Sequence, residues 1–161
     1  MKRLFLAVML VVVCRLAFAQ NFVELGRRVA LESSGLILFA EIGNIGAGDP
    51  ECRNVPFPIS DIDSLIATDV LPTMVMGATA AGEKFDNSKK ADVVNALREI
   101  PQRKEGGIIV ARKTYGDMKA NARTQYGASS ACASLSTAIN TIIHQKRAAL
   151  KNMRSSFEAK K

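Results

Sequence analysis

Few residues in this chain could carry out catalysis. His144 is the only histidine among 161 residues, and it lies between Ile143 and Gln145 in a stretch with helical spacing. An imidazole can accept and return a proton near neutral pH, but such catalysis also needs a nucleophile, and no Gly-x-Ser-x-Gly motif occurs. A single histidine also excludes the zinc motif His-Glu-x-x-His. We therefore expect His144 to be a solvated helix residue, and we expect no metal site and no cofactor.

The acidic residues are concentrated in one region. Asp49, Glu51, Asp61 and Asp63 lie close together in the sequence. Paired carboxylates can hydrolyse glycosidic bonds or bind Ca²⁺. The calcium-loop pattern is not met, and Asp61 and Asp63 follow Ser60, a residue that can cap a helix whose first turn favours carboxylates. The pattern favours an exposed loop and a helix start, with a small hydrolase that uses Asp49, Glu51 and Asp61 as the alternative.

A glycine-rich stretch precedes these carboxylates. Gly43, Gly46 and Gly48 supply backbone amides of a kind that can cradle a phosphate. Their spacing matches neither the dinucleotide fingerprint nor the P-loop, and Pro50 follows where both motifs require a helix. We expect these glycines to end the first helix and to begin a glycine- and proline-rich recognition loop at residues 44–59.

The first nineteen residues have the three parts of an export signal. Lys2 and Arg3 form a positive start, residues 4–13 are uninterrupted apolar residues, and Ala17 and Ala19 are the small residues that a signal peptidase requires. The apolar run is half as long as a membrane span, which disfavours a retained anchor. Lipidation at Cys14 is a further alternative, disfavoured by the bulky valines before it. We predict a signal peptide at residues 1–19 and a mature chain of residues 20–161, periplasmic or secreted, with no membrane span after cleavage.

Removal of the signal leaves two cysteines, Cys52 and Cys132. In an oxidising compartment they most simply pair with each other, whereas a redox pair would favour Cys-x-x-Cys spacing. Such a bond closes a long loop and stabilises the fold by on the order of 4 kcal/mol. We predict a structural disulfide that joins the loop after the first helix to the start of the last.

The apolar spacing predicts a single all-α domain of about five helices. The middle of the first helix contains Gly35, so a short buried strand at residues 36–40 is the alternative there. No run of alternating apolar and polar residues predicts a sheet. The expected helices are residues 21–43; residues 60–80, with Ser60 as the cap and Pro72 in the first turn of a continuing helix; residues 87 or 88 to 100, capped by Asn87 or Ser88 and stopped by Pro101; residues 108–126; and residues 129 or 130 to about 155.

Charge is distributed unevenly along the chain. The net charge is +7, and it falls to +4 when Lys2, Arg3 and Arg15 leave with the signal. Residues 20–111 sum to −4 and residues 112–161 to +8, which predicts a basic face that could steer an acidic partner. Nucleic acid is not expected, because no aromatic residues alternate with these charges. The candidate partner-binding residues, from the loop and from this face, are Asp49, Glu51, Arg53, Arg112, Lys113, Arg123, Lys146 and Arg147.

Together these features predict an exported small helical binding protein. In outline, a signal peptide followed by a disulfide-tied helical domain is similar to many bacterial envelope proteins, including immunity proteins that block amidases delivered by type VI secretion. The likeness covers architecture alone, so no functional position is carried over. It implies an inhibitor or immunity-type protein whose partner is an envelope enzyme. The alternatives are the carboxylate hydrolase and a structural envelope-assembly component with a self-complementary apolar surface around Met74, Met76 and Ala80. A homo-oligomer is compatible with each.

Overall fold

The computed structural model describes residues 2–82, 84, 86, 89–95 and 107–159, and these residues are almost entirely helical. No strand occurs among them, so the all-α prediction is confirmed. Residues 89–95 are helical as well. The other elements are α1 (Lys2–Ala47), the 3₁₀ turn η1 (Pro50–Cys52), α2 (Ile62–Leu65), the π-helical segment η2 (Ile66–Val70), α3 (Leu71–Ala80), α5 (Gly107–Tyr126) and α6 (Ala128–Glu158).

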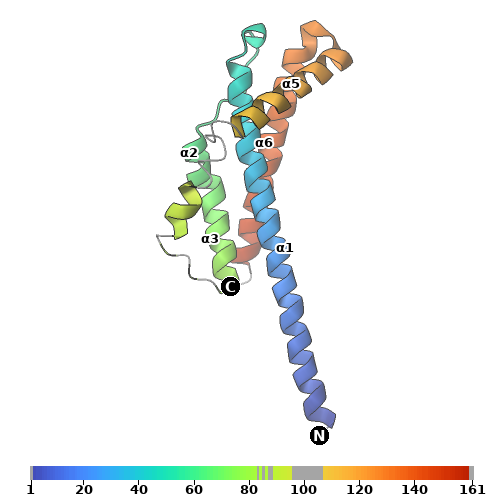
Figure 1. The fold of residues 1–161 in the computed structure, drawn as a ribbon, viewed down its shortest axis with the longest axis vertical. Coiled ribbons are helices and arrows are strands. Elements are labelled where there is room, and N and C mark those ends of the chain that lie inside the picture. Colours follow the sequence, from blue (N-terminus) through green and yellow to red (C-terminus); the bar gives the residue numbers. More distant parts are fainter. Residues whose placement is uncertain (1, 83, 85, 87–88, 96–106, 160–161) are drawn as a thin grey trace.

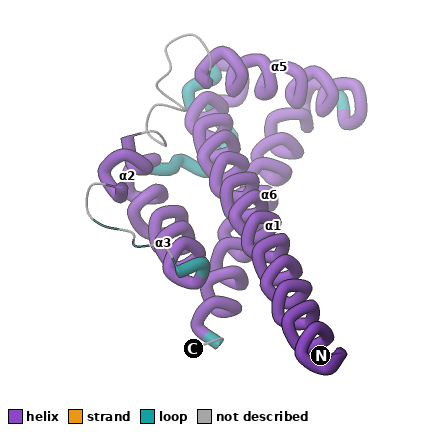
Figure 2. The backbone as a smooth tube through the Cα atoms, turned by 60° about the horizontal axis from the view of Figure 1, so that its bottom comes forward, coloured by secondary structure: helices purple, strands orange, loops and turns teal. Residues whose placement is uncertain are grey.

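The two longest helices form the centre of the bundle. Figures 1 and 2 show α1 and α6 side by side and antiparallel, with α3 packed along them and α5 lying across the end of the bundle opposite the N-terminus, against α1 and α6. The first part of α1 extends past the end of the bundle at which α6 finishes (Figure 1). This apolar N-terminal helix is compatible with an export signal.

The first helix is longer than the sequence predicts. It continues through Gly43 to Ala47, so the predicted end at residue 43 and the alternative strand at residues 36–40 are both wrong. The glycines do not end the helix; they let other segments approach it. A Cβ atom on Gly43 would lie 2.3 Å from the Pro58 carbonyl oxygen, and one on Gly46 would lie 2.3 Å from the Phe57 ring.

Gly35 has a similar role in the middle of α1. The Lys146 side chain from α6 crosses the helix there, and a Cβ atom on Gly35 would lie 3.0 Å from its Cε. Lys146 then forms an ion pair with Glu32, with its Nζ 2.9 Å from the carboxylate. The intrinsic helix penalty of this glycine is therefore offset by close packing of α1 against α6.

The segment after the loop begins one residue later than predicted. Asp61, not Ser60, caps α2, because its carboxylate accepts hydrogen bonds from the amides of Asp63 and Ser64. The Ser60 backbone instead pairs with the Asn44 side chain, which accepts from its amide and donates to its carbonyl. Pro72 lies in the first turn of α3, as expected, and its missing amide donor adjoins the π-helical segment.

Two connections set the direction of the remaining helices. The Asp86 carboxylate accepts a hydrogen bond from the Lys89 amide at 2.9 Å and so caps the helix of residues 89–95. The predicted caps Asn87 and Ser88, and the predicted stop at Pro101, lie outside the described residues. Gly127 joins α5 to α6 with a positive φ of 79°, which strongly favours glycine, and α6 begins at Ala128 rather than at residue 129 or 130.

The core lies where α1 and α6 meet α2, η2, α3 and α5. Leucine and isoleucine side chains make up most of it, among them Leu36, Ile42, Ile66, Leu135 and Ile139, each nearly inaccessible to solvent. Among the described residues, the stretch Glu24–Ala47 is long and apolar enough to cross a membrane by length and composition. Part of this stretch, including Leu36, Ile37 and Ile42, is buried in the core.

Candidate functional site

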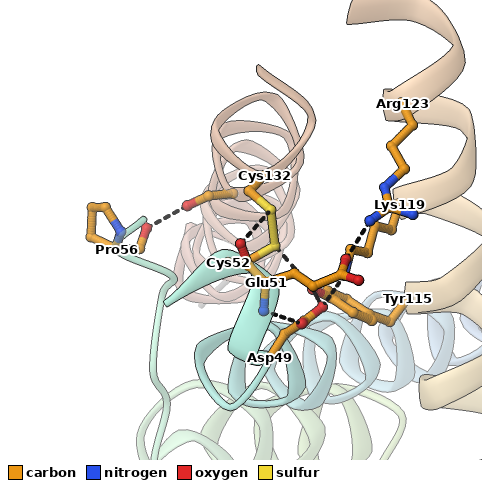
Figure 3. Close-up of a disulfide and its surroundings, with 9 residues drawn as sticks. Asp49, Glu51, Cys52, Pro56, Tyr115, Lys119, Arg123 and Cys132 are labelled. Carbon is orange, nitrogen blue, oxygen red and sulfur yellow. Dashed lines mark hydrogen bonds and ion pairs between the residues drawn. A yellow bond between two sulfur atoms is a disulfide. The ribbon is translucent and has the colours of Figure 1, made fainter. Parts of the chain in front are cut away.

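The segment between α1 and α2, residues 48–60, is tied to three helices, and we call it the tied loop. Its covalent tie is the disulfide between Cys52 in η1 and Cys132 in the first turns of α6, whose Cα atoms are 5.4 Å apart (Figure 3). This pairing is the one predicted from the sequence. The bond fixes the tip of the loop to the start of the last helix, as expected.

The second tie is a charged cluster in which Asp49 is the central acceptor. Its carboxylate caps η1 by accepting from the Glu51 amide at 2.9 Å. The same carboxylate accepts from the Tyr115 hydroxyl at 2.6 Å and from the Lys119 ammonium at 2.5 Å (Figure 3). Burial alone would raise its pKa, but these hydrogen bonds outweigh burial and lower the pKa of Asp49 from 3.8 to about 2.

Lys119 joins this carboxylate to a second one. Its Nζ is also 2.5 Å from the Glu51 carboxylate, which Arg123 contacts from the next turn of α5. The hydrogen bond from Lys119 and the charge of Arg123 lower the pKa of Glu51. Partial burial opposes the charge on Lys119, but its two carboxylate partners raise the pKa of this ammonium group. Two acids and two bases therefore balance within the cluster.

Tyr115 connects the charged cluster to the apolar core. Its hydroxyl lies 3.6 Å from Cys52 Sγ, and its ring meets Phe57 of the tied loop edge-on at a centroid distance of 6.4 Å. Burial, and then the hydrogen bond to ionised Asp49, raise the pKa of Tyr115 well above its usual range. The phenol therefore remains a neutral hydrogen-bond donor and is unsuited to act as a nucleophile.

The third tie holds the second half of the loop. The buried Ser136 hydroxyl of α6 donates to the Pro56 carbonyl at 2.5 Å (Figure 3). Phe57 fills the space beside Gly46, and Ser60 pairs with Asn44 of α1. The tied loop is thus held along its whole length, while Arg53 and Ile59 remain exposed on its surface.

The structure divides the eight candidate partner-binding residues into two groups. Five form ion pairs within the chain: Asp49, Glu51 and Arg123 in the cluster, Lys146 with Glu32, and Arg147 with Asp69 at 3.4 Å. The other three are free of interactions between helices. Arg53 and Arg112 are exposed and form no ion pair with any described residue, and Lys113 pairs only with Asp117 on its own helix, at 2.7 Å.

The carboxylates of the alternative hydrolase are arranged as structural groups. Asp61 caps α2, and Asp49 and Glu51 share one ammonium group. A glycosidase needs one carboxyl group with a raised pKa to act as the general acid, whereas the pKa values of Asp49 and Glu51 are both lowered. Proton donation from this pair at neutral pH is therefore disfavoured.

The remaining candidates for chemistry lie apart from the cluster. His144 is exposed on α6, as expected for a solvated residue. Within the described part of the chain, no three histidine, cysteine or acidic side chains are grouped as a metal site would require. Met74 and Met76 are partly buried on α3, and Ala80 is exposed at its end.

Sequence reasoning missed Tyr115, Lys119 and Ser136 as positioning residues. In the predicted helix of residues 108–126, Tyr115 belongs to the apolar spacing and Lys119 to the polar face. Tyr115, Lys119 and Arg123 are spaced four residues apart, so they line one face of α5, and this spacing was an available signal. Nothing in the sequence indicated that this face meets Asp49, which is 66 residues away from Tyr115.

Comparison with protein-family models, with curated proteins and with solved structures found no match to this chain. The molecule is therefore classified by its structure alone. It is a small all-α bundle with one disulfide, a long apolar N-terminal helix and a surface loop fixed on three helices.

Proposed function

We propose that the chain is an exported, periplasmic or secreted binding protein that acts through its surface, as an inhibitor or immunity-type protein of an envelope enzyme does. One observation carries the proposal: the tied loop is held by a disulfide, an ion cluster and a hydrogen bond from the Ser136 side chain to its backbone, although it contains little regular structure. Loops that are ordered before binding lose little conformational entropy when a partner docks. The export signal and the disulfide support a location outside the cytoplasm.

The exposed residues that face a partner in this proposal are Arg53 on the tied loop and Arg112 and Lys113 on α5. Arginine is enriched among the residues that dominate binding energy, because it combines charge with five directed donors. The partner surface is accordingly acidic where it meets Arg53. Lys146 and Arg147, which the sequence groups with these residues, form ion pairs with Glu32 and Asp69, so the proposal does not rest on them.

The test is affinity capture followed by a matched pair of variants. The tagged chain is recovered from the envelope or the medium, and co-purifying proteins are identified by mass spectrometry. The interaction with a captured enzyme is then measured with Arg53→Glu and, as a control of equal charge change, with Lys89→Glu, an exposed residue in the helix of residues 89–95. We expect Arg53→Glu to weaken binding at least tenfold and the control to leave it unchanged. Equal affinities for the two variants would refute the role of the tied loop, and recovery of the chain only from the cytoplasm would refute export.

A further inference from the structure

A set of basic residues surrounds the end of the bundle from which the N-terminal part of α1 emerges. Arg27 and Arg28 are exposed on α1, and Lys151 is exposed on α6. None of these three forms an ion pair with any residue that the structure describes. Arg154, on the last turns of α6, uses one guanidinium nitrogen to donate to the Thr68 carbonyl at 3.1 Å. We call these four residues the basic collar.

The packing of α1 against α6 places these residues at one level of the molecule. The ion pair between Glu32 and Lys146 sets the register of the two antiparallel helices. Arg28 lies one turn from Glu32 toward the leader, and Lys151 lies just over one turn from Lys146 in the same direction. Figure 1 shows α6 ending beside the point where α1 leaves the bundle.

The charge of this end is not balanced by the acids around it. Glu32 and Asp69 are each paired with a base of α6 outside the collar. Glu24 is exposed about one turn before Arg27 and Arg28 on α1, and Glu158 is exposed at the end of α6, so the collar retains a net charge of about +2 after both are counted. Leu31 follows Arg27 by four residues on the same face of α1 and is 63 % exposed, which adds an apolar contact beside the charges.

We propose that the basic collar binds the anionic surface of a lipid bilayer. The continuity of α1 argues for a membrane rather than for another acidic partner. Ala19 and Arg27 are eight residues apart on one unbroken helix, which corresponds to about 12 Å. While the predicted signal peptide, residues 1–19, occupies the membrane, the collar is therefore held close to the lipid headgroups. The separation is little more than the Debye length of about 8 Å at physiological ionic strength, and at this distance lysine and arginine are attracted to anionic lipid. The same surface remains on the chain after the leader is cleaved.

This proposal depends on export but not on the proposed protein partner. The experiment measures binding of the purified, exported chain to vesicles of phosphatidylglycerol mixed with phosphatidylcholine, and to vesicles of phosphatidylcholine alone. One triple variant, Arg27→Gln, Arg28→Gln and Lys151→Gln, removes three charges from the collar. The matched control, Lys84→Gln, Lys89→Gln and Lys90→Gln, removes three charges from the segment after α3, which belongs to neither the collar nor the proposed partner surface. Helical content by circular dichroism verifies that both variants fold.

We expect binding to the anionic vesicles that is lost in 0.5 M salt. Each basic residue near such a surface strengthens binding roughly fivefold, so the collar variant loses affinity by roughly 100-fold while the control keeps it. Equal losses in the two variants, or equal binding to the neutral vesicles, would overturn the proposal. Tighter binding to soluble polyglutamate than to anionic vesicles would assign the collar to an acidic protein instead. Failure to capture an envelope enzyme would refute the proposed function and leave these results unaffected.

Discussion

Replacement of Asp49 by asparagine separates the electrostatic role of this residue from its role as a cap. Asparagine is as good a helix cap as aspartate, so the hydrogen bond from the Glu51 amide is retained in Asp49→Asn. The charge that faces Lys119 and the strong acceptor for Tyr115 are lost. A fall of the pKa from 3.8 to about 2 corresponds to about 2.4 kcal/mol at 1.36 kcal/mol per pKa unit. Because the side chain is still 12 % exposed and the cluster is near the surface, we expect solvent screening to reduce this to about 1.5 kcal/mol.

The sign of the pH dependence follows from the lowered pKa. The stabilising contribution of Asp49 is complete above its unfolded pKa, near 4, and disappears as the pH falls through its folded pKa of about 2. Urea unfolding of the wild type and of Asp49→Asn should therefore differ by about 1.5 kcal/mol at pH 6, with little difference at pH 2. In a thermal melt the variant should unfold about 5 °C earlier at pH 6.

The matched control for this experiment is Asp117→Asn. Asp117 also accepts a hydrogen bond from a lysine, but its side chain is 64 % exposed and its partner Lys113 is on the same helix. We expect a loss below about 0.5 kcal/mol, as for other exposed pairs. A deficit of Asp49→Asn that is as large at pH 2 as at pH 6, or no larger than that of the control, would refute the electrostatic account.

Three further experiments test the other contacts that hold the loop. Replacement of both Cys52 and Cys132 by alanine should lower the free energy of unfolding by about 4 kcal/mol, measured by urea titration against the oxidised wild type. A loss under about 1 kcal/mol would contradict the argument that the disulfide stabilises the fold by restricting the unfolded chain. Gly46→Ala should destabilise the fold by about 2 kcal/mol, because its new Cβ meets the Phe57 ring. Gly26→Ala in the same helix has open space around it and should stabilise the fold by about 0.5 kcal/mol. Similar shifts in melting temperature for the two variants would show that the close contact with Phe57 is not the cause. Ser136→Ala removes the hydroxyl that donates to the Pro56 carbonyl and should destabilise the fold by about 1 kcal/mol, with faster amide hydrogen exchange in residues 54–60. Unchanged exchange would show that this hydrogen bond does not hold the loop.

The helices and the disulfide were predictable because each has a local or compositional signal. The four-residue apolar spacing of Leu135, Ile139 and Ile143 identifies α6, and two cysteines in an exported chain have one simple pairing. The end of α1 was not predictable in this way. A glycine weakens an isolated helix, but Gly43 and Gly46 are buried under the tied loop, where any larger side chain would collide with it. The contacts of the tied loop with α1 therefore explain why glycine occupies these positions and why the helix continues through them.

The charged cluster could not be predicted for a similar reason. Asp49 and Glu51 have the composition of an exposed acidic loop, and Lys119 and Arg123 have that of a solvated helix face. Their meeting depends on the angle at which α5 crosses the end of α1, which no periodicity specifies. The same applies to Lys146, which the sequence placed on a binding surface and the structure places against Glu32.

The position of the disulfide determines what a single proteolytic cleavage does to the chain. Cys52 and Cys132 enclose α2, α3 and α5, so a single peptide-bond cleavage anywhere between them leaves two fragments that are still covalently connected. Such a nicked molecule keeps the fragments that carry α1 and α6 covalently linked and migrates as one species until a reductant is added.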